Sequence, residues 1–207
     1  MGAMMRNQGS GHSGGQASRS RPRRRGAVLL DALLQAAWEE LSAAGYARVT
    51  MEGVATRAGT HKSVLYRRWP NRATVVQAAV RHRLGSLADD VPDTGDLRED
   101  VLSVLRRFRD YAEAIGPDTA RGLASEAADL PPEVLTVTPG VITAILQRAA
   151  RRGEVRPDRI TPRITALPGN LLRHELLVPH GDLSDATLTG IIDEIFLPIV
   201  VTATPSA

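Results

Sequence analysis

The chain has 207 residues, 43% of them hydrophobic, which is enough to build the cores of one or two helical domains. It has no cysteine, which excludes disulfides, thiol chemistry and thiolate-bound zinc. Its apolar runs fall well short of the ~20 residues that span a bilayer. The N-terminus also lacks the apolar segment of a secretory signal, so we expect a cytoplasmic protein with no membrane contact.

The net charge of +3 is distributed unevenly along the chain. Residues 1–26 carry six arginines and no acidic residue, whereas residues 27–90 carry a charge of +2 and residues 91–207 a charge of −5. Positive charge at the N-terminal end suits attraction to nucleic-acid phosphates. Because residues 1–26 are otherwise rich in glycine and serine, we expect them to be disordered. They would form either a basic arm that enters the minor groove or a tail that adds only non-specific attraction.

The first expected helix covers residues 27–44. Its apolar side chains recur every three or four residues and therefore share one face, and Gly45 ends it. These side chains are Leu30, Leu34, Ala37, Leu41 and Ala44.

Residues 50–72 have the pattern of two short helices joined by a glycine turn. Thr50 is placed to cap the first helix, and Gly59 occupies a position that suits a positive φ. The second helix covers about residues 61–68, and Asn71 is placed to cap the helix that follows. This order is typical of a helix-turn-helix, which lays its second helix into the DNA major groove.

The second helix of this motif has an apolar inner face and a basic, aromatic outer face. Leu65 and Trp69 are four residues apart, so they share the side that faces the core. Arginine and lysine neutralise phosphates or reach guanine, a tyrosine hydroxyl donates to a phosphate, and valine contacts a thymine methyl. The outer residues are Lys62, Ser63, Val64, Tyr66 and Arg67. Taken alone, such a face is equally compatible with a solvated helix surface.

The motifs of this region resemble the N-terminal domain of the TetR family of transcriptional repressors. The resemblance covers about residues 28–80 and rests on segments 33–41, 45–46, 50–55, 58–59 and 65–70. It implies an all-helical homodimer that binds DNA through its N-terminal domain and is released by a small molecule bound to the C-terminal domain. By position it implies DNA contacts from Thr50, His61, Lys62, Ser63, Val64, Tyr66, Arg67 and Arg72. Thr60 and His61 stand where the family commonly has Val and a capping Ser, so Thr60 becomes a candidate for the cap.

Beyond the motif we expect a helix over residues 71–88 that joins two domains, followed by a loop at 89–95. Five more helices are expected over residues 96–115, 118–130, 139–152, 161–178 and 184–200. Residues 132–137 are compatible with helix or loop, and the pair Pro168-Gly169 is expected to bend its helix.

The sequence therefore predicts an all-α fold of about nine helices in three parts. These are a basic arm (1–26), a helix-turn-helix domain with its linking helix (27–89), and a ligand-binding and dimerisation domain (90–207).

The two last helices carry wide apolar stripes, which we interpret as a dimer interface in a four-helix bundle. Its expected residues are Ile164, Leu171, Leu188, Ile192, Ile195 and Phe196. The alternative is that the stripes complete the domain's own core. Candidate ligand contacts are Phe108, Arg109, Tyr111, Glu126, Asn170, Arg173 and His174. Each polar one is also compatible with a surface charge or a satisfied core group.

The resulting hypothesis is a ligand-responsive repressor that binds a palindromic operator as a homodimer. A regulator controlled by a protein partner or by its abundance is the alternative, and activation instead of repression stays open. An enzyme is disfavoured because G-x-S-x-G, Gly-rich phosphate-loop and H-E-x-x-H motifs are absent. We expect neither a cofactor nor a metal.

Overall fold

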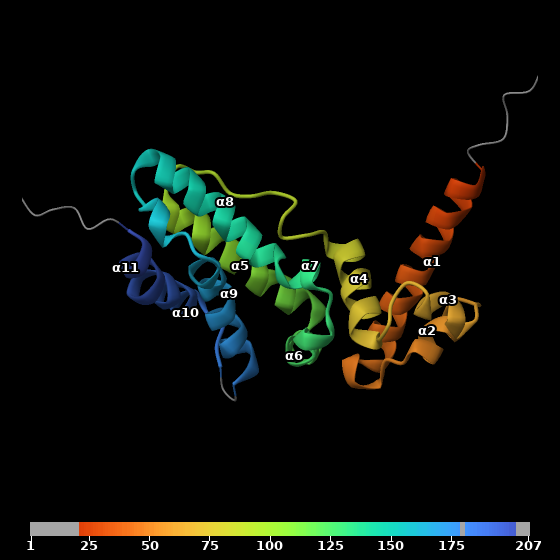
Figure 1. Cartoon of the computed structure of the whole chain (residues 1–207). Helices are drawn as coiled ribbons and strands as arrows, with labels where there is room; N and C mark the ends of the chain where they lie inside the picture. The colour runs from red at the N-terminus through yellow and green to blue at the C-terminus, as the bar shows by residue number, and fades with distance from the viewer. Residues whose placement is uncertain (1–20, 179–180, 202–207) are drawn as a thin grey trace, which may run out of the picture.

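The computed structural model describes residues 21–178 and 181–201, with side chains from residue 26 onward. These residues form helices joined by short turns, and their only strand-like pairing is an isolated antiparallel bridge between Val155 and Val201. The expected all-α fold is confirmed. Two lobes are visible in Figure 1, an N-terminal one built from α1 to α4 and a C-terminal one built from the remaining helices.

The N-terminal lobe contains α1 (Arg21–Ala44), α2 (Met51–Arg57), α3 (Lys62–Tyr66) and α4 (Arg72–Leu84), with the short 3-10 helix η1 (Tyr46–Arg48) after α1. The expectation of disorder across residues 1–26 is wrong for residues 21–26, which belong to α1. Arginine is a good helix former and a proline fits the first turn of a helix, so the arginine-rich segment extends α1. Residues 1–20 lie outside the described residues.

Local capping sets the helix boundaries of the motif. The Thr50 side chain accepts a hydrogen bond from the Gly53 amide at 2.9 Å, and Gly59 has a φ of 62°. Asn71 and Thr74 form a capping box at the start of α4. The candidate Thr60 is not the cap of α3, because the helix begins after His61, whose side chain makes no capping hydrogen bond.

The C-terminal lobe contains α5 (Leu97–Ile115), α6 (Pro117–Ser125), α7 (Pro132–Leu135), α8 (Val137–Arg152) and α9 (Pro162–Leu177), and ends with α10 (Asp185–Gly190), η4 (Ile191–Phe196) and α11 (Leu197–Val200). The short 3-10 helices η2 (Ala127–Asp129) and η3 (Pro157–Arg159) follow α6 and α8.

Two helices of this lobe differ from the expectation, and the segment 132–137, whose sequence is compatible with helix or loop, is helical for the most part, as α7 and the first residue of α8. The helix expected over 118–130 is divided into α6 and η2. The helix expected over 184–200 contains a π-helical segment, η4, between α10 and α11. Pro168 lies inside α9, which continues to Leu177.

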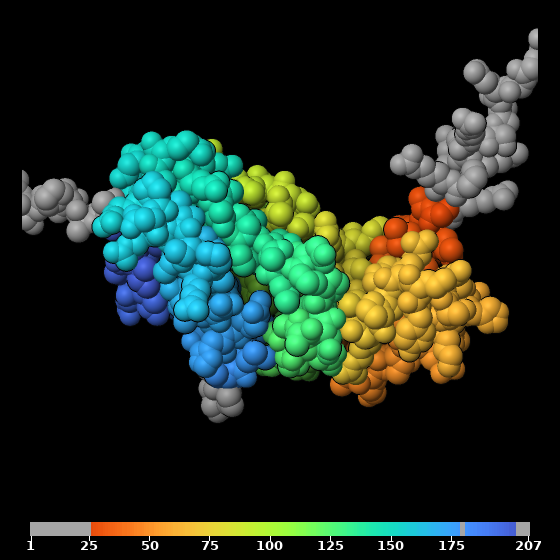
Figure 2. Space-filling model, in the orientation of Figure 1, coloured from red at the N-terminus to blue at the C-terminus, as the bar shows by residue number. Residues whose placement is uncertain are grey.

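Each lobe has its own core, and helix α4 belongs to the N-terminal one. Val75, Val76, Ala79 and Val80 of α4 are buried against α1, α2 and α3. Tyr111, Ile115 and Leu123 of the C-terminal lobe pack against this same cluster. The lobes therefore share an apolar contact, and Figure 2 shows the surface of α6 and α7 (green) abutting the N-terminal lobe (orange and yellow).

Candidate nucleic-acid interface and pocket

Helix α3 presents a continuous polar and basic face to solvent. Leu65 is fully buried and anchors the helix, while five of the expected DNA contacts on it or at its start are exposed: His61, Lys62, Ser63, Tyr66 and Arg67. Thr50 is exposed as well, although its hydroxyl already caps α2. Among the residues that the structure describes, Lys62 and Arg67 have no carboxylate partner. Their charge is therefore available to an external anion.

Val64 differs from its neighbours on α3. It is half-buried and packs against the N-terminal core, so only part of its side chain is available to a thymine methyl.

Arg72 lies at the start of α4, but its guanidinium binds within the protein. It forms an ion pair with Glu126 through Nη2, and its Nη1 donates to the Ala47 carbonyl at 3.3 Å. Its Cζ also lies 5.1 Å from the centroid of the Tyr46 ring, within the range of a cation–π contact. Arg72 and Glu126 are 54 positions apart in the sequence and belong to opposite lobes, so their ion pair connects the two lobes.

Tyr46 completes this contact between the lobes. Its side chain is only 4% exposed, and its hydroxyl donates to Glu126 Oε2 at 3.0 Å. The ring lies directly against Gly122 of α6: a Cβ placed on Gly122 would be 2.1 Å from Tyr46 Cδ1. Only glycine allows this approach. We refer to Tyr46 and Arg72 against Gly122 and Glu126 as the domain contact.

The ionisation of the domain contact follows from its geometry. Hydrogen bonding from Arg72 holds the pKa of Glu126 below its ordinary value, so the carboxylate is charged at neutral pH. Burial raises the pKa of Tyr46, and its hydrogen bond to Glu126 acts in the same direction, so the phenol keeps its proton. Asn71 adds a further link, because its side-chain amide donates to the Asp129 carbonyl at 3.2 Å.

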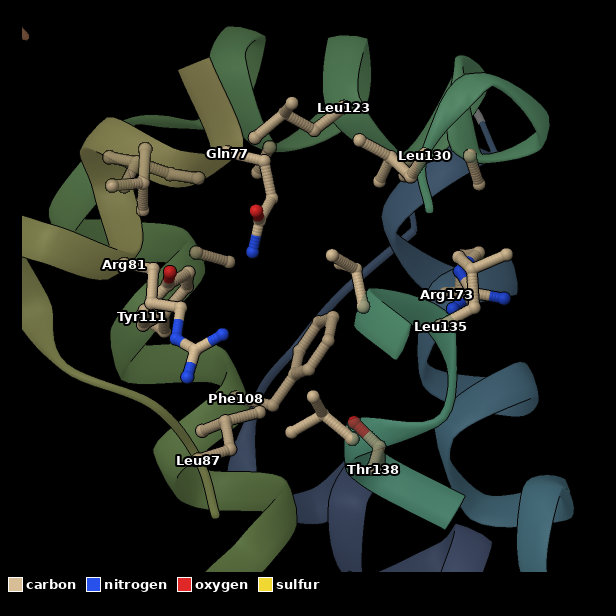
Figure 3. Close-up of a pocket in the computed structure, with 18 of the residues that line it drawn as sticks. Gln77, Arg81, Leu87, Phe108, Tyr111, Leu123, Leu130, Leu135, Thr138 and Arg173 are labelled. Atoms are coloured by element: carbon tan, nitrogen blue, oxygen red, sulfur yellow. The ribbon is translucent and has the colours of Figure 1, made fainter. Parts of the chain in front are cut away.

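A cavity of about 170 Å³ lies where α4 meets the C-terminal lobe (Figure 3). Its wall is mainly apolar and comes from α4, the turn after it, and helices α5 to α9. The apolar lining includes Val80, Leu87, Phe108, Ala112, Ile115, Leu123, Leu130, Val134, Leu135 and Leu176. Polar groups are fewer: Gln77, Arg81, Ser86, Tyr111, Thr138 and Arg173.

The structure places three of the expected ligand residues at this cavity, namely Phe108, Tyr111 and Arg173. The other four do not line it: Arg109, Glu126, Asn170 and His174. Arg109 pairs with Asp185, and Glu126 belongs to the domain contact. Asn170 and His174 are exposed on α9. Two of the four are thus paired within the protein and two face solvent, and none of them contacts this cavity.

Sequence reasoning missed two polar residues of the cavity wall, Gln77 and Arg81 of α4. They are four residues apart and therefore share a helix face, beside Val80, which lines the cavity as well. That spacing is a usable signal, although the sequence of residues 71–88 points first to a helix that links two domains. Burial raises the pKa of Tyr111, which faces Arg81, to about 12.

The expected dimer residues fall into two groups. Leu188, Ile192 and Phe196 are fully buried in the core of their own lobe, so their assignment to an interface is wrong. Ile164 and Leu171 are half-buried, and Ile195 is 40% exposed. Only these three retain surface that a second chain is able to cover.

Residues 21–178 and 181–201 offer neither a metal site nor a membrane-spanning helix. No group of three or more His, Cys, Asp or Glu side chains is arranged to hold a metal ion. None of the described helices has the length and apolar character needed to cross a membrane.

Comparison with known proteins bears on both lobes. The family model described as "Bacterial regulatory proteins, tetR family" matches residues 33–79, and "Tetracyclin repressor-like, C-terminal domain" matches residues 91–195. The chain is 32% identical over 183 residues to the DNA-binding transcriptional repressor TetR of Mycobacteroides abscessus, covering 85% of this chain and 96% of that protein. It is 27% identical over 198 residues to the uncharacterized HTH-type transcriptional regulator YdeS of Bacillus subtilis, covering 91% and 97%.

Solved structures agree with this. The TetR family transcription regulator SCO0332 is 26% identical and superposes with a TM-score of 0.61, covering 81% of this chain and 96% of its own. SmeT, the repressor of the Stenotrophomonas maltophilia multidrug efflux pump SmeDEF, is 19% identical with a TM-score of 0.54, over 84% and 90%, a likeness in fold alone. With matches to both lobes and a relative of 32% identity along most of its length, the chain belongs to the TetR family of helix-turn-helix transcriptional regulators.

Proposed function

We propose that the protein is a homodimeric repressor that binds a palindromic operator and is released by a small-molecule effector. The observation that carries this proposal is the shared wall between the cavity and the N-terminal core. Val80 lines the cavity and is also buried among α1 to α3, and Tyr111 and Leu123 line the cavity and pack against that same core. A molecule that changes the cavity therefore acts on the helix-turn-helix directly.

On the DNA side, the exposed face of α3 is the proposed reading surface. Lys62 and Arg67 would contact phosphates or guanine, Tyr66 would donate to a phosphate, and Thr50 would do so from the start of α2. Val64 contributes only its exposed part.

Arg72 has a double role in this proposal. It lies at the N-terminus of α4, where a phosphate would also meet the first amides of the helix. Its ion pair with Glu126 then competes with the phosphate for the same guanidinium. A shift of α6 that moves Glu126 would change what Arg72 offers to DNA.

The effector would act through differential affinity for two arrangements of the lobes. Helices α6 and η2 supply Ala120, Leu123 and Ala127 to the cavity, and Gly122 and Glu126 of the same segment hold the domain contact. Filling the cavity would displace this segment and α4 together. The two reading helices of the dimer would then leave the spacing of about 34–36 Å that successive major grooves require.

The dimer is proposed to form through α9 and the segment from α10 to α11. Ile195 is 40% exposed and Leu177 is 42% exposed, and the half-buried Ile164 and Leu171 lie on α9. Pairing of these helices with those of a second chain would cover them in a four-helix bundle.

The test is selection of bound fragments from the organism's own DNA, with the oligomeric state measured by sedimentation equilibrium. We expect a dimer that retains a few palindromic sites at moderate salt. The exposed residue Arg151, which has no ion pair among the described residues, provides the control variant Arg151→Gln. Retention of DNA without sequence preference, or a monomer that binds a single half-site as tightly, would contradict the proposal.

A further inference from the structure

We propose that the effector cavity takes an apolar molecule with an anionic head, an ionised carboxylic acid being the smallest of this class. This inference rests on the proposed function, because it concerns the ligand of the same cavity. It follows from the charges of the wall and from the partners that these charges have.

The cavity wall contains two cations and no anion. Arg81 and Arg173 line it, whereas no aspartate or glutamate is among the lining residues. In Figure 3, Arg81 lies with Tyr111 and Gln77 on one side of the cavity and Arg173 lies with Leu135 on the other, with Phe108 between them. Arg81 is exposed to solvent and Arg173 is half-buried, so a negatively charged group on the solvent side of the cavity would have a guanidinium on either side.

Neither arginine is neutralised by the described part of the protein. Arg81 makes no ion pair there, and the one hydrogen bond of the Arg173 side chain goes to the neutral Asn170 Oδ1 at 3.4 Å. Some arginines of the C-terminal lobe are paired, as Arg98 is with Asp193 and Arg106 with Asp185, whereas others, such as Arg151, have no ion pair among the described residues. What distinguishes Arg81 and Arg173 is their place in the cavity wall. The two arginines at the cavity thus retain a full charge and unused donors beside an apolar wall.

Other polar side chains of the cavity wall also favour a ligand that carries hydrogen-bond acceptors. Burial keeps the Tyr111 phenol protonated, since its pKa is raised to about 12, so its hydroxyl is able to donate. Gln77 and Thr138 supply further donors. The apolar majority of the wall requires an apolar body, and the guanidinium fork matches a carboxylate in two parallel hydrogen bonds.

The experiment measures binding to the full-length protein by calorimetry, without DNA. Two matched pairs of probes differ only in the head group: octanoate against 1-octanol, and 2-naphthoate against 2-naphthalenemethanol. We expect the acid of at least one pair to bind roughly ten to a hundred times more tightly than its alcohol, the range of a charge-assisted hydrogen bond.

Variants locate the effect. Arg81→Gln and Arg173→Gln should each weaken binding of the acid roughly tenfold or more and leave binding of the alcohol within about twofold. Arg163→Gln is the control, because Arg163 lies on α9 like Arg173 but is exposed and away from the cavity. Unfolding curves for all variants show whether a variant that loses binding is still folded. The comparison of acid with alcohol is made in the parent protein and does not depend on any variant.

The outcomes separate the two proposals. The inference of an anionic head group is overturned if the alcohols bind as tightly as the acids. It is also overturned if neither arginine substitution weakens binding of the acids. Either result leaves the proposal of an effector cavity unaffected. Failure of all four probes to bind overturns this inference and counts against the effector part of the proposed function, while DNA binding stays untouched.

Discussion

Replacing Gly122 by alanine tests whether the domain contact is formed as described. The new Cβ would lie 2.1 Å from Tyr46 Cδ1 and 2.5 Å from Cε1, far inside contact distance. The tyrosine ring is 4% exposed and held by the N-terminal core, so it has little room to move. Either α6 shifts away from the N-terminal lobe or the ring is displaced.

Two opposing effects set the magnitude. Alanine in a helix is favoured over glycine by up to about 1 kcal/mol. Overpacking a buried contact costs about 1–3 kcal/mol. We therefore expect Gly122→Ala to lower the free energy of unfolding by between zero and about 2 kcal/mol.

A matched control isolates the steric effect. Gly140 also lies in a helix, α8, and a Cβ there would meet no atom within 4 Å. Gly140→Ala should stabilise the protein by up to about 1 kcal/mol. Urea unfolding of both variants gives the comparison, and Gly122→Ala should be about 1–3 kcal/mol less stable than Gly140→Ala. Equal stabilisation of the two variants would refute the reasoning, because the ring could then not lie against Gly122.

Three further substitutions test the remaining features. Glu126→Gln removes the partner of Arg72, a half-exposed pair that contributes up to about 1 kcal/mol. Because the pKa of Glu126 is lowered in the folded protein, this contribution is present above its ordinary value of 4.5 and is lost as the pH falls through the lower folded-state value. The stability difference between the parent protein and Glu126→Gln should thus shrink in urea titrations below pH 4.5, and a difference that persists in acid would contradict the ion pair. Asn71→Ala removes the cap of α4 and the bond to the Asp129 carbonyl, so unfolding should become easier by about 1–2 kcal/mol; no change in the urea midpoint would count against the capping box. Lys62→Ala should weaken operator binding and reduce the slope of log K against log salt by about 1, whereas Arg151→Gln should leave that slope unchanged. Equal slopes for Lys62→Ala and the parent protein would place α3 away from the phosphates.

Features set by neighbouring residues were predictable from the sequence. Thr50 and Asn71 cap helices through hydrogen bonds to the amide three residues further on, so their types and positions indicate where the helices start. Gly59 indicates the turn, because glycine readily adopts the positive φ that the turn requires. Their positions in the structure agree with the prediction. The fold class follows from the same periodic and capping signals.

Features that depend on distant partners were not predictable. Apolar spacing shows which side of a helix avoids water but not which surface covers it. The pattern of Leu188, Ile192 and Phe196 therefore suggests a second chain, although their own lobe buries them. The sequence points only to DNA as the partner of Arg72, because Glu126 lies 54 residues further along the chain. The sequence around either residue contains no sign of the other.

Helix α4 has consequences for how such a regulator diversifies. One side of it is fixed by the packing of the reading motif, through residues such as Val76 and Ala79, and the other side offers Gln77 and Arg81 to the cavity. Under the proposed function, a change on α4 would therefore alter operator choice and effector choice in a single step. Positions such as Leu135 and Thr138 face the cavity without joining the N-terminal core. Under the same proposal, such positions would let the cavity adapt to a new effector without direct change to the packing of the reading motif.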